Sequence, residues 1–280
     1  MDIHIQKKDV KKLIELALKE DIGRGDITSS AIFSRHDESR ALIISKGHGY
    51  LCGTRMVQYV YEFIDKEVVV ERLMEDGSEI LPGIEIIRIS GPTISVLTGE
   101  RTALNFLQRM TGIATKTAGV VTMLKGSQIE ILDTRKTLPG YRLLDKYAVK
   151  TGGGTNHRMG LYDMVMIKDN HIRRAGGIAR AVQIIRNRYG SRYTVEVETS
   201  NLDEVREALS SQADIIMLDN MSRSQMESAI QLINKSAKIE ISGNIDEDRI
   251  SSLKDLSVDY ISMGSLTHSV QAFDLSMRFL

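Results

Sequence analysis

Six short apolar runs after about residue 112 each end in side chains that can bind anions, metals or sugars. These ends read Asp133-Thr134-Arg135-Lys136, Lys168-Asp169-Asn170, Glu196-Val197-Glu198, Asp219-Asn220, Ser242-Gly243 and Gly264-Ser265. Arginine and lysine bind carboxylates and phosphates, carboxylates bind Mg²⁺, and glycine turns offer backbone N–H groups to phosphate. One polar strand end is usually only solvated, but six in succession, with both charge signs, indicate a shared binding site.

The charge distribution along the chain also indicates an anion site. The 37 basic and 37 acidic residues give a formal net charge of zero. Between Arg135 and Arg174, however, nine lysines and arginines face only three aspartates, an excess of six positive charges. A solvated basic face is the alternative explanation, but these basic residues are interleaved with three glycines and with apolar positions. The neutral total argues against a protein that coats nucleic acid.

Glu198 and Asp219 end two consecutive runs. Neighbouring strands lie about 4.8 Å apart, so the two carboxylates would be close enough to share Mg²⁺ or to bind sugar hydroxyls. Salt bridges to nearby lysines are the alternative. Lys136 and Lys168 can hold anions as point charges, and a lysine at a strand end can also form a Schiff base with a carbonyl substrate.

Two serine–glycine turns close the fifth and sixth runs. Their backbone N–H groups, with the hydroxyls of Ser242 and Ser265, would suit a phosphate group. A single turn of this kind carries little information. Two on consecutive late strands of a barrel are more specific, because late strands of such barrels commonly hold phosphate.

The elements that must position these residues alternate between strands and helices. The six runs are residues 129–134, 164–168, 194–198, 215–219, 238–242 and 260–264. Helical patterns lie between them at residues 177–188, 202–210, 224–234 and 246–253. This alternation predicts parallel strands with helical crossovers, in a barrel or a doubly wound sheet. In a barrel, all six strand ends would share one face, where active sites are built.

The first third of the chain has a different pattern. An amphipathic helix over residues 10–18 precedes strand-like runs at 41–45, 68–73 and 84–90, and a further helix follows from about residue 98. This pattern predicts a small α+β domain.

Composition excludes several classes of protein. A single cysteine, Cys52, rules out an internal disulfide framework and fits a reducing compartment. No apolar run approaches the roughly 18 residues of a spanning helix, and the charged N-terminus has no apolar signal core, so we expect a cytoplasmic protein. His157 and His171 have no recognised zinc spacing, and no serine–histidine or cysteine–histidine pair suggests a nucleophile.

With these residues in view, the chain resembles the quinolinate phosphoribosyltransferase family. The most specific block is LDTRKTLPGYRLLDKYAVKTGGGTNHRMGLYDMVMIKDNHI, residues 132–172. The shorter segments EDIGRGDIT, GERTALNFLQRMTGIAT, VEVET, IIMLDN and YISMGSLTHS are similar to the family in the same order. The resemblance covers nearly the whole chain.

The resemblance implies an α/β fold: an N-terminal α+β sandwich domain over residues 1–111 and an incomplete, six- to seven-stranded parallel α/β barrel over residues 112–267. A C-terminal helix over residues 268–280 is expected to pack back on the first domain.

The implied reaction joins quinolinate to phosphoribosyl pyrophosphate, with Mg²⁺, and releases nicotinate mononucleotide, pyrophosphate and CO₂. Such a pair of substrates is strongly anionic and suits the basic segment. The chemistry expected is electrostatic: carboxylates stabilise a cationic ribose carbon, and Mg²⁺ and basic groups stabilise pyrophosphate as it leaves. The 2-carboxylate then leaves as CO₂ because the ring nitrogen has become a cationic electron sink.

The resemblance also assigns roles by position. Lys136, Lys168, Glu198 and Asp219 correspond to catalytic residues, and Glu198 and Asp219 to the acids that hold ribose and, directly or indirectly, Mg²⁺. Arg101 resembles an arginine delivered from the neighbouring subunit, which implies a homodimer with a shared active site. The full expected set of substrate-binding residues is Arg101, Thr134, Arg135, Lys136, His157, Arg158, Lys168, Glu198, Asp219, Ser242, Gly243, Asn244, Met263, Gly264, Ser265 and His268.

One departure from the family pattern concerns the phosphate turn. The family usually has Ser-Gly-Gly where this chain has Ser242-Gly243-Asn244. Asparagine tolerates a positive φ better than other non-glycine residues, so the turn is expected to survive with a weaker hold on phosphate. Met263 and Ser265 replace the commoner valine and alanine, with little effect expected.

Three other interpretations compete with this one. A barrel lyase or aldolase would use Lys136 or Lys168 as a Schiff base. A related transferase associated with molybdenum transport departs from the family at the NHR and KDNH positions, which this chain keeps. A binding protein that has kept the fold would lack one of the acids or lysines, and none is missing.

Overall fold

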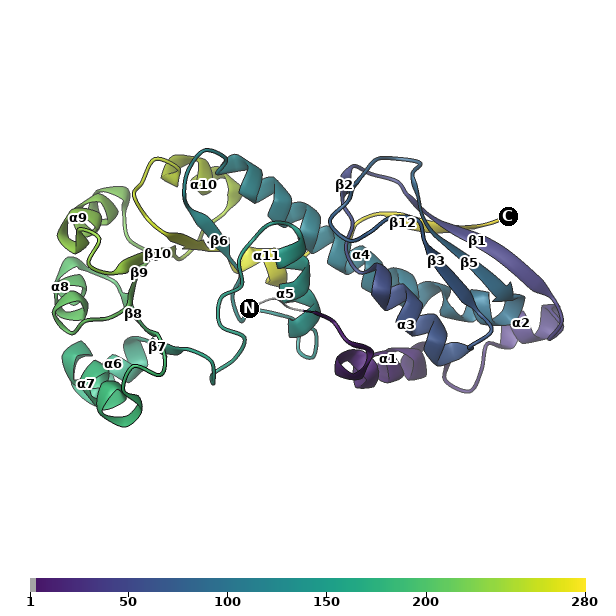
Figure 1. The fold of residues 1–280 in the computed structure, drawn as a ribbon, viewed down its shortest axis with the longest axis horizontal. Helices are drawn as coiled ribbons and strands as arrows, with labels where there is room; N and C mark the ends of the chain where they lie inside the picture. Colours follow the sequence, from purple (N-terminus) through teal and green to yellow (C-terminus); the bar gives the residue numbers. More distant parts are fainter. Residues whose placement is uncertain (1–3) are drawn as a thin grey trace. The chain divides into compact units, whose positions relative to one another are not determined.

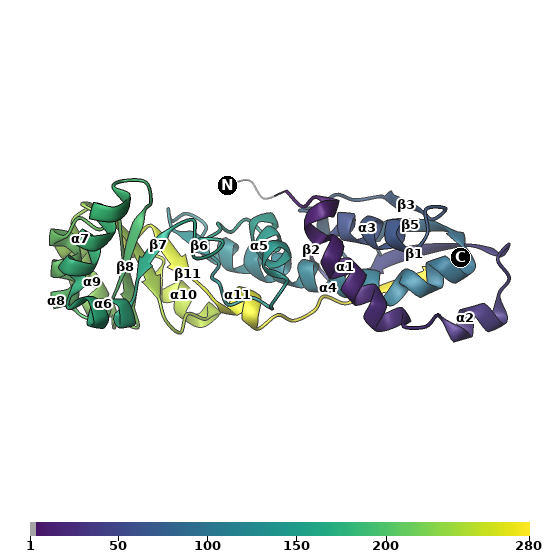
Figure 2. The same ribbon diagram turned by 90° about the horizontal axis from the view of Figure 1, so that it is seen from below.

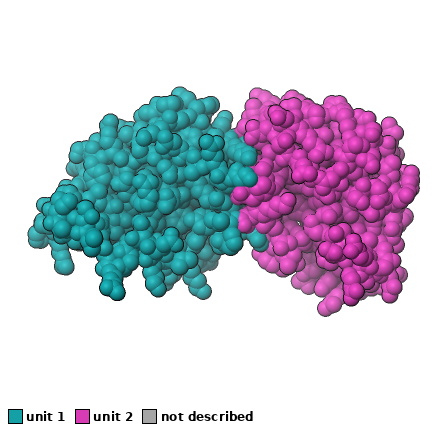
Figure 3. Space-filling model, turned by 180° about the vertical axis from the view of Figure 1, so that it is seen from behind, with its two compact units in different colours: residues 1–118, 138–153, 269–280 teal, residues 119–137, 154–268 magenta. Residues whose placement is uncertain are grey.

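The structure, a computed structural model, describes residues 4–280. The chain divides into two compact units (Figure 3). The first unit holds the chain up to Ala118 together with Leu138–Gly153 and Ser269–Leu280, and the second holds Gly119–Thr137 and Gly154–His268. The chain therefore returns to the first unit twice, with segments that the sequence assigns to the barrel and to a C-terminal helix. Within residues 4–280, no helix is long and apolar enough to cross a membrane.

The first unit is built on a four-stranded antiparallel sheet in the order β12-β1-β5-β3 (Figure 1). Its strands are β1 (Glu38–Ser45), β3 (Val69–Arg72), β5 (Glu85–Pro92) and β12 (Leu275–Phe279), and β2 (Gly49–Tyr50) pairs with β4 (Glu79–Ile80) in a separate ladder. The helices are α1 (Lys7–Ile22), α2 (Ile27–Ile32), α3 (Thr54–Ile64) and α5 (Arg142–Thr151), with the long α4 (Thr93–Met123) ending in the second unit.

The expected first helix forms and is longer than its apolar core. Val10, Ile14 and Leu18 recur every four residues and form the buried stripe of α1. Helix α1 packs on α3, and α3 packs on the sheet at β3 (Figure 2). Asp26 caps α2 by accepting hydrogen bonds from the backbone N–H groups of Thr28 and Ser29. The α+β character predicted for this part of the chain is confirmed.

The prediction of a C-terminal helix over residues 268–280 is wrong. Residues 265–268 form the short helix α11 (Ser265–His268), and Leu275–Phe279 is the strand β12, paired antiparallel with β1. Ala41 lies opposite Phe279, and Ser45 lies opposite Leu275. The resemblance suggested that this segment returns to the first unit, and it does so by completing a sheet edge.

The second unit contains the six predicted strands in one parallel sheet. They are β6 (Glu130–Leu132), β7 (Val165–Ile167), β8 (Val195–Thr199), β9 (Ile215–Asp219), β10 (Lys238–Ser242) and β11 (Tyr260–Ser262), in the order β6-β11-β10-β9-β8-β7. This is the cyclic order of a barrel with one ladder missing, between β6 and β7. The incomplete barrel is thereby confirmed.

The missing ladder has a cause in the chain path. The crossover between β6 and β7 carries α5, which belongs to the first unit, so it supplies no helix to the barrel wall. Thr155 pairs with the open edge: its N–H donates to Ile131 O at 2.8 Å, and its carbonyl accepts from Asp133 N at 3.2 Å. The segment after α5 therefore lies beside the end of β6.

Alternation along each strand separates the two faces of the sheet. Val195, Val197, Ile239 and Ile241 are buried apolar residues, whereas Glu196, Glu198, Glu240 and Ser242 occupy the alternate positions. The outer side of the curved sheet carries helices α6 (Asp169–Ala175), α7 (Ile178–Tyr189), α8 (Leu202–Ser210), α9 (Arg223–Ile233) and α10 (Glu247–Leu253) (Figure 1). The inner face is thus lined with polar side chains.

Candidate active site

A pocket of about 830 Å³ opens at the carboxyl ends of the barrel strands, entirely within the second unit. It is lined by Thr134, Arg135, Lys136, His157, Arg158, Met166, Lys168, Glu198, Met217, Asp219, Asn220, Glu240, Ser242, Gly243, Asn244, Ile245, Asp246, Ser262, Gly264, Ser265 and His268. The polar strand ends therefore converge on one pocket, as the sequence predicted.

All but two of the expected substrate-binding residues line this pocket. Arg101 lies exposed on α4 in the first unit, and it is not part of the lining. Met263 is buried, and its backbone N–H donates to Leu132 O at 2.9 Å, so its contribution within the described chain is to hold β11 beside β6.

Lys168 and Glu198, which both line the pocket, form an ion pair. Their Nζ and Oε2 atoms lie 2.6 Å apart, and both side chains remain partly accessible. The alternative foreseen for Glu198, a salt bridge to lysine, is therefore present. One carboxylate oxygen remains to meet a further ligand, so the ion pair and ligand binding are compatible.

Asp219 lies on the same face as Glu198. In the parallel ladder Glu198 is opposite Met217, and Asp219 follows two residues later, so both side chains project to the same side. Asp219 Oδ2 accepts a hydrogen bond from Asn220 Nδ2 at 2.8 Å. Two carboxylates with oxygens directed to a polar pocket match the ligands that Mg²⁺ takes alongside substrate phosphates. The residues present fit a magnesium ion.

The turn after β10 has a left-handed backbone at two consecutive residues. Gly243 has φ +92° and Asn244 has φ +50°, so asparagine is compatible with this turn. A Cβ on Gly243 would lie 2.4 Å from Asn220 Oδ1, which makes glycine obligatory there. Asn244 Nδ2 donates to the same oxygen at 3.1 Å and thus links the turn to the residue after Asp219.

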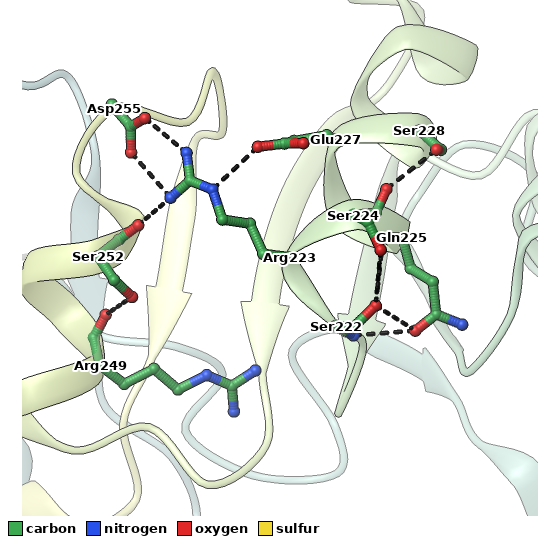
Figure 4. A network of polar contacts seen from close by, with 9 residues as sticks. All are labelled: Ser222, Arg223, Ser224, Gln225, Glu227, Ser228, Arg249, Ser252 and Asp255. Carbon is green, nitrogen blue, oxygen red and sulfur yellow. Dashed lines mark hydrogen bonds and ion pairs between the residues drawn. The ribbon is translucent and has the colours of Figure 1, made fainter.

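Arg249 ties the turns after β9 and β10 together. Its guanidinium donates to Gly243 O at 2.7 Å and to Met221 O at 3.1 Å. Figure 4 shows Arg249 beside a second arginine, Arg223, which bonds Glu227, Asp255 and the Ser252 carbonyl between α9 and α10. The two arginines therefore differ in purpose: one holds turns of the pocket, and the other joins two outer helices.

The second glycine turn lies under Lys136. A Cβ on Gly264 would lie 2.9 Å from Lys136 Cδ and 3.1 Å from His268 Cδ2, so glycine leaves room for the lysine chain to pass. The Lys136 carbonyl accepts from Thr267 Oγ1 at 2.8 Å, and Lys136 N donates to Thr134 Oγ1 at 3.0 Å. These bonds fix the loop after β6 against α11.

His157 and Glu240 line the pocket, and together with Glu196 they form a buried cluster that the sequence did not predict. His157 Nε2 lies 3.0 Å from Glu196 Oε2 and 3.4 Å from Glu240 Oε2, and both glutamates are fully buried. We call these three residues the Glu–His–Glu cluster. Burial by itself would lower the pKa of His157, but the hydrogen bonds and charges of both carboxylates outweigh it and raise the pKa to about 9. Burial raises the pKa of Glu196 to about 7.

Arg158 adjoins this cluster. Its side chain donates to Met164 O at 3.2 Å and contacts Met166 Sδ at 3.7 Å. Burial, and then the positive charge of Arg135, lower the pKa of Arg158, while the charge of Glu196 opposes that change. Arg135 and Arg158 therefore place two like charges near each other above buried carboxylates.

A usable signal for the missed residues was the strand period. In VEVET, Glu196 shares a face with Glu198, and in KIEIS, Glu240 shares a face with Ser242. Charged residues at alternate positions on a buried strand indicate the barrel interior. Counting back by two from each strand end would have placed both glutamates, and also Met166 and Met217, on the face of the strand-end residues.

Comparison with known proteins gives one consistent family. The model of the quinolinate phosphoribosyl transferase C-terminal domain matches residues 113–278, and the N-terminal domain model matches residues 26–111. A probable nicotinate-nucleotide pyrophosphorylase [carboxylating] of Bacillus subtilis is 41% identical over 98% of this chain and 93% of its own. The chloroplastic nicotinate-nucleotide pyrophosphorylase [carboxylating] of Arabidopsis thaliana is 40% identical over 96% of this chain and 82% of its own length.

Solved structures agree with the sequence comparison. The crystal structure of NadC from Streptococcus pyogenes matches with a TM-score of 0.96 and 41% identity, covering 100% of both chains. The nicotinate-nucleotide pyrophosphorylase from Francisella tularensis matches with a TM-score of 0.94 and 38% identity, covering 99% of this chain and 98% of that one. Both similarities extend over the two units.

Proposed function

Because this chain belongs to the quinolinate phosphoribosyltransferase family, we propose that its barrel pocket binds quinolinate and phosphoribosyl pyrophosphate together. The enzyme transfers the phosphoribosyl group to quinolinate with loss of CO₂, forming nicotinate mononucleotide and pyrophosphate for NAD biosynthesis. The composition of the pocket supports this assignment most strongly. Basic side chains, two acids and two glycine turns line a single cavity of about 830 Å³.

The basic side chains are proposed to bind the negative groups of both substrates. Arg135, Lys136, Arg158 and Lys168 come from the ends of β6 and β7 and from the segment between these strands, and all line the pocket. Arginine can hold a carboxylate through two parallel hydrogen bonds, and lysine acts as a point charge. This division suits the rigid quinolinate dicarboxylate at the arginines and the flexible pyrophosphate at the lysines.

Glu198 and Asp219 are proposed to hold the ribose hydroxyls and Mg²⁺. Support comes from their common face and from carboxylate oxygens not used by Lys168 or Asn220. The ion, when bound, neutralises charge on the departing pyrophosphate. The two carboxylates themselves stabilise positive charge that develops on C1 of the ribose.

The turns after β10 and β11 are proposed to bind the 5′-phosphate. Ser242, Gly243 and Asn244 form one side, and Gly264, Ser265 and His268 form the other. Anchoring this remote phosphate fixes C1 relative to the ring nitrogen of quinolinate, which lowers the entropic cost of reaction.

The proposed sequence of bonds follows from that arrangement. The ring nitrogen forms a bond to C1 with its lone pair as the bond from C1 to pyrophosphate breaks. The pyridinium nitrogen then attracts the electron pair of the bond between C2 and its carboxylate, CO₂ departs, and C2 takes up a proton. A Schiff base at Lys168 is disfavoured, because its ammonium group is ion-paired with Glu198 at 2.6 Å.

The deciding assay combines purified protein, quinolinate, phosphoribosyl pyrophosphate and Mg²⁺, with nicotinate mononucleotide and CO₂ measured together. Equal amounts of both products are expected, and chelation of Mg²⁺ should stop their formation. Binding of quinolinate without turnover would contradict the proposed function and indicate a binding protein. Trapping of a carbonyl compound on Lys136 or Lys168 by borohydride would indicate a lyase instead.

A homodimer with a shared active site is part of the proposal. The support is Arg101, which the family pattern places in the partner's pocket and which lies exposed on α4. Arg101→Ala should inactivate the protein without altering its unfolding temperature. Mixing it with the inactive Lys168→Ala protein should restore activity, up to about one quarter of the sites if subunits exchange randomly. A mixture that stays inactive although subunits exchange would argue against a shared active site.

A cytoplasmic location is also proposed, consistent with the free, buried Cys52.

A further inference from the structure

Asn220 lies between two parts of the pocket that the proposed function gives to one substrate. It follows Asp219 at the end of β9, and both residues line the pocket. Its backbone N–H donates to Ser242 O at 3.0 Å, so it is also bonded to the turn after β10. The proposed function places ribose and Mg²⁺ at Asp219 and the 5′-phosphate at that turn, and it gives Asn220 no role.

The side chain of Asn220 joins the same two parts. Its Nδ2 donates to Asp219 Oδ2 at 2.8 Å, and its Oδ1 accepts from Asn244 Nδ2 at 3.1 Å. A carboxylate only accepts hydrogen bonds, so the atom of Asn220 that faces Asp219 must be the amide nitrogen. This orientation leaves the amide oxygen for Asn244. One planar amide group therefore links the acid to the turn.

The backbone at Asn220 restricts which residue can make this link. Its φ is +53°, in the left-handed region that few residue types adopt at low cost. Glycine adopts this region freely but has no amide side chain. Aspartate tolerates it but has no N–H group to donate to a second carboxylate. Of these three residue types, asparagine alone combines the backbone tolerance with a donor and an acceptor.

The two acids of the pocket are held by partners of different charge. Glu198 Oε2 lies 2.6 Å from the ammonium group of Lys168, which offsets the charge of this glutamate. Asp219 accepts instead from the neutral amide of Asn220. A neutral donor orients a carboxylate without cancelling its charge. The contact therefore suits an acid that faces Mg²⁺ or a ribose carbon that becomes cationic.

We propose that Asn220 is a positioning residue that aligns Asp219 with the turn after β10, an inference that rests on the proposed function. Phosphoribosyl pyrophosphate contacts this turn through its 5′-phosphate and Asp219 through ribose or Mg²⁺. Because one amide links the two sites, binding of the phosphate sets where ribose meets Asp219. Without the amide both sites remain, but their relative orientation is less well defined, which makes the productive geometry harder to reach.

The first test removes the side chain and keeps the backbone. Asn220→Gly adopts φ +53° freely but loses both amide contacts. We expect kcat/KM for phosphoribosyl pyrophosphate to fall about tenfold, and the Mg²⁺ concentration for half-maximal rate to rise about fivefold. KM for quinolinate should change less than about twofold. If neither kcat/KM for phosphoribosyl pyrophosphate nor the Mg²⁺ requirement changes, the proposal is overturned.

Asn234→Gly is the matched control. Asn234 is an exposed asparagine of the same unit with φ +44°, at the C-cap of α9 and outside the pocket lining. Its replacement makes the same chemical change in the same kind of backbone, so the kinetic constants should stay as in the wild-type protein. Equal losses in the two glycine variants would overturn the proposal, because they would make backbone freedom responsible.

Asn220→Asp separates the two contacts of the amide. Aspartate tolerates the left-handed backbone and can still accept from Asn244, but it cannot donate to Asp219. Its kcat/KM for phosphoribosyl pyrophosphate should therefore fall by at least about tenfold. A value near that of the wild-type protein would mean that Asp219 does not need this donor, and the proposal would be wrong.

A spectroscopic test does not depend on turnover. With asparagine side chains labelled with ¹⁵N, the Nδ2 signal of Asn220, identified by its loss in Asn220→Gly, should move when Asp219→Asn is introduced. The same signal should stay in place in Asn234→Gly. A signal that Asp219→Asn leaves unmoved would overturn the proposal. If the wild-type protein forms no nicotinate mononucleotide, the proposed function fails, and this measurement still judges the link between Asn220 and Asp219.

Discussion

The two sides of the pocket are held in place by different means. Beneath Arg158, the Glu–His–Glu cluster is buried and ionic. Around the turn after β10, which we propose as the phosphate turn, Asn220, Asn244 and Arg249 use hydrogen bonds at an accessible surface, and the backbone adopts positive φ at Gly243 and Asn244. A buried charge left without its partner is costly, whereas a lost surface hydrogen bond is partly replaced by water. The first side should therefore tolerate far less change than the second.

The largest expected effect is on stability. Glu196→Ala should lower the free energy of unfolding by about 3 kcal/mol, because the change breaks a buried ion pair and leaves a cavity. Glu196→Gln keeps the side-chain volume, so its free energy of unfolding should fall by clearly less than that of Glu196→Ala. Urea denaturation measures both values. A loss in the alanine variant below about 1 kcal/mol would mean that this cluster behaves like a surface pair, and the contrast between the two sides would disappear.

Lys168→Ala should have the next largest effect, on rate rather than on folding. Its ion pair with Glu198 is partly accessible, so its loss costs little stability. We expect kcat to fall at least about 100-fold, as when a preorganised electrostatic group is removed. The exposed Lys235→Ala is the control, with unchanged kinetics expected. Steady-state assays decide this prediction, and a kcat near that of wild type would remove Lys168 from the catalytic set.

Arg249→Ala sharpens the comparison from the phosphate side. The turns after β9 and β10 lose two hydrogen bonds to their carbonyls, so KM for phosphoribosyl pyrophosphate should rise about fivefold, with KM for quinolinate unchanged. Arg223→Ala is a close control, because this arginine binds Glu227 and Asp255 between outer helices (Figure 4). Equal kinetic changes in both variants would show that general loosening, rather than the held turns, is responsible.

The smallest effect is expected at Asn244. Asn244→Gly loses the bond to Asn220 but adopts φ +50° freely, so KM for phosphoribosyl pyrophosphate should change by no more than about twofold. Asn244→Ala must hold a methyl group in the same backbone region, and its KM should rise by about fivefold or more. If the alanine variant matches the glycine variant, backbone conformation is not what holds the phosphate turn.

The sequence predicted best what strand order and residue type determine. Strand–helix alternation predicted all six barrel strands, and the polar ends of those strands predicted the basic residues, Glu198, Asp219 and both glycine turns. Glu240 was missed, and Glu196 was given no role although it belongs to a strand-end segment, because only the last polar residues of each run were assigned roles. The prediction of a C-terminal helix was wrong because Leu275–Phe279 pairs with β1 as a strand. Such long-range pairing leaves no local signal in the sequence.

The pairing of β12 with β1 has a consequence for how the chain is made. Ala41 and Phe279 are neighbours in the sheet, although they lie far apart in the order of synthesis. Until residues 275–279 leave the ribosome, β1 has an open edge, and its buried Ala41, Leu42 and Ile43 belong to an unfinished sheet. The first unit to be translated is therefore among the last to be completed. A chain stalled before residue 275 would expose that edge to aggregation and to chaperones.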